Sequence, residues 1–579
     1  MNARRLLELY ERILEAPDAI PRLRRFVFDL AVRGKLVRQD RRDEPASELL
    51  KRLTQLTGRD AFANQDDVPF RLPPGWECSS VGQLTTKTGS GSTPRGGKEV
   101  YRKQGIPFLR SQNIHNEGLR LGEVAYIDES THMRMSGTAV APGDLLLNIT
   151  GGSIGRCCRL GEGQFVANIS QHVAIIRLAL REMGGYIHAV VLSPYFQKYV
   201  IDEQTGAGRG GLPKNRMDRI PVPVPPLAEQ QRIVSRLDEL MTLCDRIDAA
   251  RKGREATRYK LTAASLARLS APDPDTFRDD AGFVLDVLPA LTARPDQIKR
   301  LRQTILNLAV RGKLTPQEPK DGPASELLKR IAAERDSLVD EGAIRREKIL
   351  DPVGLDDLPF ELPSNWVWSR IGSAVLFTQY GTSERSEPGD TGVPVLTMGN
   401  IQNGLAIWGN DKRIPESSND LPALYLHKFD ILYNRTNSAE LVGKTGIYLG
   451  ENDVRTFASY LIRIRTSLTH GCPRYLNLAM NSPVFRESQI VPLIKKQTGQ
   501  ANVNGTALRN MLVPLPPLAE QRRIVAKVHE LMALCDRLEA SVVAADDARG
   551  RLLEALLAEA LAPTENLTSM APTQLAAHG

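Results

Sequence analysis

The chain contains one long segment twice, and this duplication limits the folds that it can adopt. Residues 225–248 read PPLAEQQRIVSRLDELMTLCDRID, and residues 516–539 read PPLAEQRRIVAKVHELMALCDRLE, 291 positions later (516 minus 225). Each copy opens with two prolines, which suit the first turn of a helix, and then continues without Gly or Pro. Both copies therefore predict the start of a long helix.

Apolar residues in each copy follow an alternating spacing of four and three. This pattern is the a/d seam of a coiled coil, which is narrower than the apolar face of a globular helix. The two copies are then the obvious partners for each other, although a surface helix on a single core is the alternative. The seam positions are Ile233, Leu237, Leu240, Cys244 and Ile247 in the first copy, and Ile524, Val528, Leu531, Cys535 and Leu538 in the second.

Two shorter blocks also repeat. LAVRGKL occurs at 30–36 and 308–314, and PASELLKR occurs at 45–52 and 323–330, both 278 positions apart (308 minus 30 and 323 minus 45). Identical blocks at one fixed offset indicate an internal duplication of the chain.

The regions between the repeated blocks, 66–224 and 356–515, match each other only loosely. Their short apolar runs are separated by Gly, Pro, Asn and Ser, which predicts mixed α/β domains with many loops. Near-identical helices beside divergent central regions are expected when the helices bind shared partners and the central regions bind different targets. The alternative is an old duplication whose surfaces drifted, but drift should have blurred the helices as well.

These observations predict an α/β (α+β) architecture, with two mixed domains separated by long helices and a pseudo-twofold relation between the halves. The expected segments are an N-terminal helical stretch (1–65), a first central domain (66–224), a first long helix (225–270), a linker (271–297), a helical repeat of the N-terminal stretch (298–355), a second central domain (356–515), a second long helix (516–562) and a disordered tail (563–579).

Composition narrows the class of protein. Lys and Arg number 76 against 68 Asp and Glu, and the net charge of +8 is a mild indication of a polyanionic partner. The sequence has no signal peptide and no apolar run of the ~20 residues that span a bilayer, which predicts a cytoplasmic protein without membrane contact. Its six cysteines form no CxxC pair, which indicates a reducing compartment and matches no zinc pattern.

The loops of the first central domain are rich in cations, hydroxyls and amides. Such groups can contact phosphates, and Arg, Asn and Gln can also bond to base edges. For each residue the alternative is a turn or a solvated loop. The candidates for DNA contact are Thr88, Ser90, Thr93, Arg95, Lys98, Arg110, Gln112, Asn113, Arg156, Gln171, Arg209 and Lys214.

The second central domain offers a different polar set at the same places. If both domains read DNA, they should read unlike half-sites separated by a gap. A helix of about 40 residues spans roughly 60 Å, so an antiparallel pair could hold the domains one to two DNA turns apart. The candidates are Tyr380, Thr382, Arg385, Thr397, Asn400, Asn434, Arg435, Asn437, Lys496 and Gln500.

Enzymatic signatures are missing from the sequence. It contains no P-loop GxxxxGK[ST] and no Asn- or Asp-Pro-Pro-aromatic motif of the kind used by amino-methyltransferases. Asp144 and Asp430 occupy equivalent positions, but the apolar run after each favours a role at the start of a strand. We therefore predict a non-catalytic chain that carries no metal or cofactor of its own.

Taken together, the two PPLAEQ blocks, the LAVRGKL and PASELLKR repeats and the alternation of variable domain and long helix resemble the specificity (S) subunit of Type I restriction-modification systems. The resemblance covers nearly the whole chain. It implies two target recognition domains, each reading one half of a gapped, asymmetric site in double-stranded DNA, joined by an antiparallel coiled-coil spacer. It also implies that the seam helices bind partner subunits.

The partners implied by this resemblance carry the chemistry. Two modification subunits would hold S-adenosylmethionine and methylate adenine, and restriction subunits would use ATP and Mg. Two other interpretations stay open at this point. One is a self-contained enzyme such as a fused methyltransferase or nuclease, and the other is a scaffold whose variable domains bind proteins. Salt-sensitive, sequence-selective DNA binding would separate the scaffold from the specificity subunit.

Overall fold

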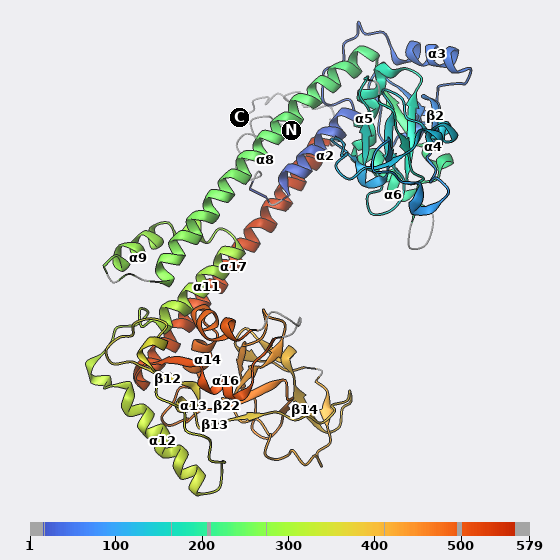
Figure 1. Cartoon of the computed structure of the whole chain (residues 1–579). Coiled ribbons are helices and arrows are strands. Elements are labelled where there is room, and N and C mark those ends of the chain that lie inside the picture. Colours follow the sequence, from blue (N-terminus) through green and yellow to red (C-terminus); the bar gives the residue numbers. More distant parts are fainter. Residues whose placement is uncertain are drawn as a thin grey trace, which may run out of the picture. The chain divides into compact units, whose positions relative to one another are not determined.

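Two long helices connect two compact units. The computed structural model describes residues 15–16, 18–163, 165–204, 210–271, 273, 275–409, 411–494 and 501–561. The chain divides into one unit of residues 1–254 with 546–579 and a second unit of residues 255–545. The helices α8 (Leu227–Ser270) and α17 (Leu518–Leu561), of 44 residues each, start in one unit and end in the other (Figure 1). The two long helices predicted from the repeated segment are thus confirmed.

The first central domain is built on a four-stranded antiparallel sheet. Its strand order is β2 (Thr85–Ser90), β10 (Val173–Leu178), β7 (Leu145–Asn148) and β8 (Cys157–Arg159). One face packs on α5 (Gly184–Leu192) and α6 (Pro194–Asp202). Leu145 and Leu147 belong to that core, whereas Leu146 belongs to a second core. Because successive strand residues face opposite sides, a sheet covered on both faces needs such an unbroken apolar run.

A small three-stranded sheet contributes to the second core. Phe108 and Leu109 of its middle strand are buried, and Leu109 and Ile169 pack in the same cluster as Leu146. Its strand order is β6 (Ala125–Ile127), β3 (Ile106–Leu109) and β9 (Asn168–Ile169).

The second central domain repeats this plan with an extension. Its main sheet has six strands, of which the first four correspond to those of the first domain. The order is β13 (Phe377–Tyr380), β22 (Leu461–Arg465), β18 (Ile431–Asn434), β20 (Thr445–Ile447), β16 (Leu405–Ala406) and β15 (Ile401–Gln402). Its small sheet has the order β17 (Arg413–Ile414), β14 (Val393–Leu396) and β21 (Thr456–Phe457).

The first and last strands of each central domain pair with each other just before a long helix begins. In the first domain β1 (Glu77–Ser80) pairs antiparallel with β11 (Pro221–Val224), and in the second β12 (Val367–Arg370) pairs with β24 (Leu512–Leu515). Each central domain therefore closes on itself at the point where the chain enters α8 or α17.

A buried glutamate ties each long helix to its central domain. Glu229, in the first turn of α8, accepts hydrogen bonds from the Trp76 Nε1 at 3.1 Å and from the Gln39 Nε2 at 3.2 Å. Burial raises the pKa of the Glu229 carboxyl. Glu520 of α17 accepts the same two bonds, from Trp366 at 2.9 Å and Gln317 at 3.0 Å. The repeated PPLAEQ motif is therefore explained by packing inside each unit.

The LAVRGKL repeat also has an internal role, because it ends a short helix in each unit. The helices are α2 (Ala19–Val32) and α11 (Pro295–Val310). Gly34 and Gly312 follow them with φ of +64° and +66°. A Cβ on Gly34 would lie 2.4 Å from Cγ of Pro73, and one on Gly312 would lie 2.5 Å from Cγ of Pro363. Only glycine fits this left-handed turn against a proline ring.

The seam residues of each long helix pack in the core of their own unit, whereas the sequence predicted that the two seams would pack against each other. Ile233 and Leu237 belong to the same core as Val27 of α2, and Ile524 belongs to the same core as Ile298 of α11. Each seam is thus covered within its own unit, and the predicted pairing of one seam with the other is wrong for these residues. Cys244 is buried and Ile247 is half-buried. The other seam residues lie in or against the same two cores: Leu240, Val528, Leu531, Cys535 and Leu538.

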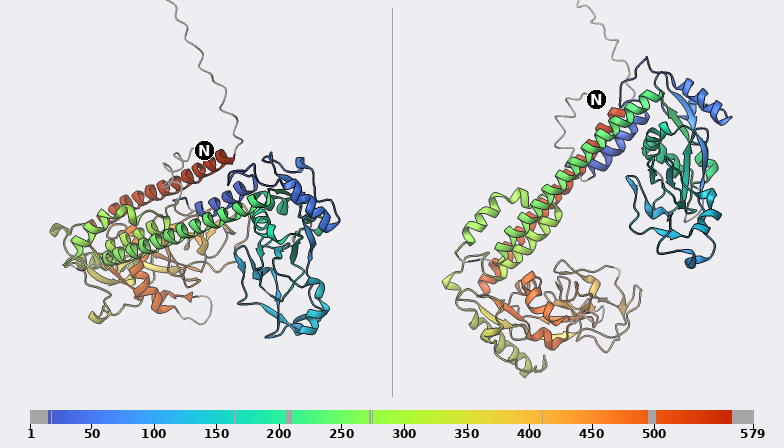
Figure 2. Two further views of the ribbon diagram at one scale, coloured as in Figure 1. Left: turned by 90° about the horizontal axis from the view of Figure 1, so that it is seen from above. Right: turned by 45° about the horizontal axis from the view of Figure 1, so that its top comes forward.

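In both units the short helix also contacts the last part of a long helix that began in the other unit. In the first unit, Ala19 of α2 packs with Leu553 of α17, and Figure 2 shows α2 (blue) beside both α8 (green) and the end of α17 (red). In the second unit, Gln297 of α11 donates to Thr262 of α8 at 3.2 Å. Each unit therefore holds the start of one long helix and the end of the other.

Two predicted segments differ in the structure. The expected linker is largely helical, with α9 (Phe277–Asp286), α10 (Leu288–Leu291) and the start of α11, because Val284 and Leu291 pack against Leu266 of α8. The predicted disordered tail, 563–579, lies outside the described residues. The remaining short helices include α3 (Ala46–Thr57) and α12 (Ala324–Asp340). Among the helices of the described residues, none is long and apolar enough to cross a membrane.

The proline contact of Gly34 predicts a larger loss of stability than positive φ alone would cause. Gly58, at the end of α3, has φ of +66° but nothing within 4 Å of an added Cβ. We expect Gly58→Ala to cost about 1 to 2 kcal/mol for its backbone conformation. Gly34→Ala should cost about 2 to 5 kcal/mol, because overlap with Pro73 adds to that penalty. Denaturant unfolding of both variants measures the difference, and equal losses would contradict the packing role of Gly34.

Candidate nucleic-acid interface

In the first central domain, several of the predicted polar loops meet at one end of the four-stranded sheet. Ser90 ends β2, and the amide of the next residue, Gly91, donates to the Val173 carbonyl at 3.0 Å. The Ile149 amide, just after β7, donates to the His172 carbonyl at 3.0 Å. Ser90, the start of the 149–156 loop and the Gln171–His172 pair therefore lie together.

Two further segments join this end of the sheet. Asn148 donates through Nδ2 to the Ser111 carbonyl at 2.9 Å, and the Leu212 amide donates to the Ile149 carbonyl at 2.9 Å. The Thr150 hydroxyl is 2.7 Å from Nδ1 of His172. We call the resulting group the first loop cluster: Ser90, Ser111, Thr150, Gln171, His172 and Gly211.

The second central domain has a corresponding group around Arg435. The Arg435 guanidinium lies 5.0 Å from the centre of the Tyr380 ring, and it donates to the Ser459 carbonyl at 3.2 Å and to Oδ1 of Asn502 at 3.1 Å. The Arg435 amide donates to the Tyr460 carbonyl at 3.0 Å. We call this group the second loop cluster: Tyr380, Arg435, Thr436, Asn437, Tyr460 and Asn502.

The two clusters occupy equivalent positions on the same frame. Val173 pairs with Asn148 in the first sheet as Leu461 pairs with Asn434 in the second, so His172 corresponds to Tyr460. The bridge between Thr150 and Gly211 likewise corresponds to the pairing of β19 (Thr436–Asn437) with β23 (Ala501–Asn502). The backbone frame is shared, while the side chains that it presents differ in size and polarity.

An ion pair braces the start of the central strand in each sheet. Asp144 is buried and accepts two hydrogen bonds from Arg177, both of 2.8 Å. Asp430 does the same with Arg465, at 2.7 Å for both bonds. The hydrogen bonds to Asp144 raise the pKa of the Arg177 guanidinium. The prediction that both aspartates act at strand starts is therefore confirmed.

Four residues predicted to contact DNA are buried or make hydrogen bonds within their own domain, and their contact with DNA stays a prediction. Asn113 accepts from the Arg110 amide at 3.0 Å and donates to the Arg120 carbonyl at 2.9 Å, which closes a turn. Short polar side chains after a strand commonly serve their own backbone in this way. The other three are Asn400, which accepts from the Thr397 amide at 2.7 Å, Thr382, whose buried hydroxyl bonds to Asp420, and Asn434, which is 2% exposed.

The remaining candidates are exposed or half-buried, and several lie outside the clusters. Lys214 is ion-paired with Asp218 on α7 (Lys214–Arg219), and both line a hollow of about 390 Å³ with Thr88. The Arg385 side chain is 90% exposed, and its Nε lies 4.0 Å from Oε1 of Glu387. Exposed side chains also occur at Thr93, Arg95, Gln112 and Arg156, and Arg110 is half-buried. Arg209, Lys496, Gln500 and the side chain of Lys98 lie outside the described residues.

His172 and Tyr460 are cluster members that sequence reasoning did not consider as candidates for DNA contact. His172 and Tyr460 each stand directly before a buried strand, β10 and β22. Aligning those two strands would have placed His172 and Tyr460 at one position, which is the signal that could have found them.

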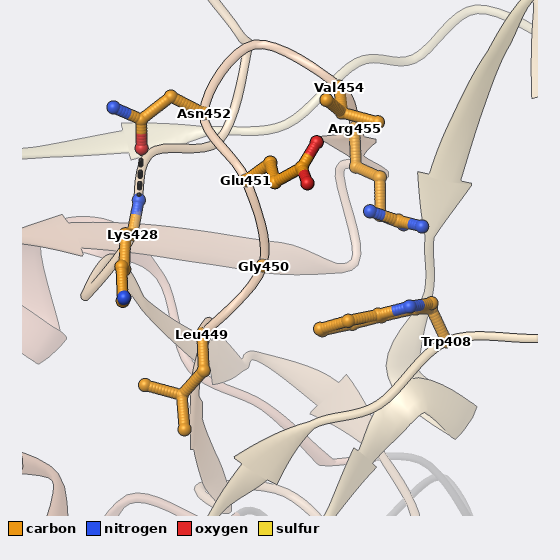
Figure 3. A pocket seen from close by; sticks show the side chains of 8 residues that line it. All are labelled: Trp408, Lys428, Leu449, Gly450, Glu451, Asn452, Val454 and Arg455. Carbon is orange, nitrogen blue, oxygen red and sulfur yellow. Dashed lines mark hydrogen bonds between the residues drawn. The ribbon is translucent and has the colours of Figure 1, made fainter.

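The opposite end of the six-stranded sheet carries a different aromatic site. A hollow of about 670 Å³ is lined there by residues that include Trp408, Lys428, Glu451 and Arg455. The Arg455 guanidinium lies 4.6 Å from the centre of the Trp408 ring, and Figure 3 shows the two side chains stacked with Glu451 directed toward them. Lys428 precedes β18 and the 449–455 loop follows β20, so this hollow and the second loop cluster lie at different strand ends.

Comparison with known proteins agrees with the duplicated architecture. A family model described as the Type I restriction modification DNA specificity domain matches residues 73–254 and again 363–543. The chain is 30% identical over 563 residues to the Type I restriction enzyme EcoEI specificity subunit of Escherichia coli, covering 94% of each chain. It is also 30% identical over 567 residues to the EcoAI specificity subunit of Escherichia coli, covering 93% of each.

The fold is similar to that of a chain in a solved structure, which is described as the structural basis of complex assembly and conformational transition of the type I R-M system. The TM-score is 0.50 at 17% sequence identity, and the match covers 85% of this chain and 99% of that chain. This likeness supports the two-domain fold with long helices.

The position of the second loop cluster predicts which exposed aromatic residue affects DNA binding. Tyr460 is 48% exposed within the cluster, and Trp408 is 42% exposed at the other end of the same sheet. We expect Tyr460→Ala to weaken binding by about 1 to 3 kcal/mol, because bases and sugars lose a contact surface. Trp408→Ala is the matched control. Fluorescence anisotropy with duplexes selected from a random pool by the unmodified protein measures both, and equal losses would contradict this interface.

Proposed function

The chain belongs to the family of Type I restriction-modification specificity subunits, and we propose that it selects the DNA site on which such a complex acts. The observation that carries this proposal is the pair of loop clusters, which stand on one frame but present different side chains. A duplicated frame with different polar surfaces suits the recognition of two different short sequences.

Each cluster, in this proposal, reads one half of a bipartite site in the major groove. In the second domain, Arg435 and Asn437 supply donors and acceptors suited to guanine and adenine edges. In the first domain, Gln171 offers an amide, and Thr93 and Arg95 supply a hydroxyl and a cation for phosphates. Because the two sets differ, the half-sites differ, and the whole site is asymmetric.

The long helices supply the spacing between the half-sites. Each has 44 residues, which corresponds to a length of about 66 Å. Since one DNA turn is about 34 to 36 Å, helices of this length suit two domains that read the same duplex with a gap between them. The recognition domains would set the sequence, and the helices would set the length of the gap.

Catalysis, in this proposal, belongs to partner subunits. Two modification subunits carrying S-adenosylmethionine would methylate adenine in the two half-sites, and restriction subunits would use ATP and Mg²⁺. Support comes from the relatives, which are named as specificity subunits of Type I restriction enzymes, and from the sequence, which lacks methyltransferase and nucleotide-binding motifs. The chain itself would be non-catalytic and hold no cofactor.

Sequencing of modified bases tests the proposal directly. In cells that express the chain with its modification subunit, we expect N6-methyladenine at one gapped, asymmetric motif, and we expect it to vanish when the chain is deleted. Replacing residues 66–224 by the first domain of another family member should change one half-site only. Replacing residues 356–515 is the matched exchange and should change only the other half-site.

Two outcomes would count against this function. A methylation pattern that persists without the chain would remove its role in site selection. If instead both clusters captured proteins and the chain showed no salt-sensitive, sequence-selective DNA binding, a protein-binding scaffold would replace the specificity subunit.

A further inference from the structure

The second half of the chain contains a short segment that the first half lacks. The PASELLKR blocks lie 278 positions apart, but Trp76 and Trp366, which make the same bond to their long helices, lie 290 apart (366 minus 76). Twelve additional residues (290 minus 278) therefore follow α12 in the second half. Residues 345–354 of this region form no helix or strand, and we call residues 347–352 the cover segment.

A glutamate holds the cover segment against the second central domain. Glu347 lies 3.0 Å from Nη2 of Arg509 on α16 (Gly505–Asn510), and it accepts from the Thr378 hydroxyl of β13 at 3.5 Å. Arg509 also donates to the Lys348 carbonyl at 3.0 Å. The Glu347 and Arg509 side chains are only 22% and 17% exposed. An acidic side chain of an extended segment is thus packed beside the edge strand of the main sheet.

The rest of the cover segment packs on the elements next to that strand. Arg370, the last residue of β12, donates to the carbonyls of Asp351 at 2.8 Å and Pro352 at 3.3 Å. Gly372 belongs to α13 (Ile371–Ala374), and a Cβ added to it would lie 2.8 Å from Cδ1 of Leu350. The cover segment therefore makes polar contacts through carbonyls and a carboxylate, and one apolar contact through a leucine.

The first unit has the same frame beneath this surface. The Val81 amide donates to the Ile220 carbonyl at 3.1 Å, as the Ile371 amide donates to the Met511 carbonyl at 2.9 Å. Strand pairing places Thr88 of β2 where β13 has Thr378. A Cβ on Gly82 would meet Asp218, as one on Gly372 meets Arg509. The residues that contact the cover segment thus have four counterparts in the first unit: Ser80, Gly82, Thr88 and Asp218.

All four counterparts line the hollow of about 390 Å³ in the first unit. The second unit covers the equivalent surface with its own chain, whereas the first unit leaves it open. The hollow also borders β2, which is the edge strand of its sheet. Edge strands present unpaired backbone groups, and proteins commonly cover them with a loop or another segment. An open edge beside a hollow is therefore suited to an added segment.

The charges of the hollow favour an anionic occupant. Three cations line it, Arg59, Lys87 and Lys214, together with one carboxylate, Asp218. Lys214 is paired with Asp218, whereas Arg59 and Lys87 donate to backbone carbonyls at 3.2 and 2.7 Å. Burial lowers the pKa of the Lys87 ammonium, which means that its charge has lost part of its hydration. An incoming carboxylate would compensate that loss.

We propose that the hollow of the first unit binds an extended acidic peptide segment of another protein. A carboxylate of that peptide would bond to the Thr88 hydroxyl, as Glu347 does to Thr378, and would lie near the cations of the hollow. An apolar side chain would rest on Gly82, as Leu350 does on Gly372. Because the second unit covers its own site, each chain would bind one such peptide.

A peptide is favoured over a DNA phosphate as the occupant. In the second unit the equivalent surface is covered by peptide, and the contact includes the apolar side chain of Leu350 as well as polar groups. A phosphate backbone offers no counterpart to the leucine. Peptides that lie along a sheet edge commonly gain affinity from main-chain groups and selectivity from side-chain pockets.

A fluorescent peptide tests this proposal on the full-length chain. It has the sequence of residues 343–353 with Arg345→Glu, Arg346→Glu and Lys348→Glu, which replace three cations by carboxylates. We expect fluorescence anisotropy to show one bound peptide per chain. The unaltered 343–353 peptide keeps the leucine but not the acidic charge, and it should bind about tenfold more weakly or less.

Variants of the hollow should weaken this binding. Thr86 lines the hollow and is exposed, so Thr86→Glu adds a like charge at a position that tolerates substitution. Lys87→Met removes a cation and keeps the length of the side chain. We expect each to weaken binding of the acidic peptide by about tenfold. Thr391→Glu, at an exposed threonine of the second unit, is the matched control and should have no effect. Circular dichroism confirms that each variant is folded.

Photocrosslinking locates the bound peptide without any change to the chain. The acidic peptide carries a benzophenone side chain at the position of Leu350. Because Leu350 contacts Gly372 in the second unit, the probe should label residues around the counterpart Gly82, which mass spectrometry of the digested adduct identifies.

Three results would overturn the proposal. The acidic peptide could bind no more tightly than the unaltered one, or its crosslink could fall outside the lining of the hollow. Thr86→Glu and Lys87→Met could also leave peptide affinity unchanged while they weaken binding of the selected DNA duplex. In that last case the occupant of the hollow is a DNA phosphate and not a peptide carboxylate.

Discussion

One buried carboxylate joins each long helix to the domain that precedes it. Glu229 accepts hydrogen bonds from Trp76 and Gln39, and Glu520 repeats the arrangement at the start of α17. A buried carboxylate that lost such donors would keep its desolvation cost without compensation, so the contact is strongly specified. In each unit these bonds hold together the segment after the short helix α2 or α11, the central domain and the start of the long helix.

The loop clusters can differ between the halves because their frame is made of backbone hydrogen bonds. The amide of residue 149 bonds to the carbonyl of His172 at 3.0 Å, and the amide of Arg435 bonds to the carbonyl of Tyr460 at the same distance. A backbone frame makes few demands on side chains, so His172 in one copy and Tyr460 in the other leave it intact. The joint at Glu229 depends on side chains and therefore repeats almost without change.

Pattern reasoning succeeded where a feature is local. The long helices, the mixed α/β centres and the strand-start role of Asp144 follow from periodicity, turn residues and position in an apolar run. It was wrong about the partner of the seam, because Ile233 packs with α2 of its own unit. It also could not separate Asn113, which closes a turn, from Gln171, which is exposed, because both are amides in polar loops.

The sequence by itself determined the duplication, the two long helices and the family resemblance. Repeated blocks and heptad spacing depend only on the order of residues along the chain. Only the tertiary structure decided which face of each helix is covered and which polar residues come together. The reason is physical. An apolar seam requires a partner but does not name it, and residues as distant as Tyr380, Arg435 and Asn502 meet only when strand pairing brings their loops to one end of a sheet.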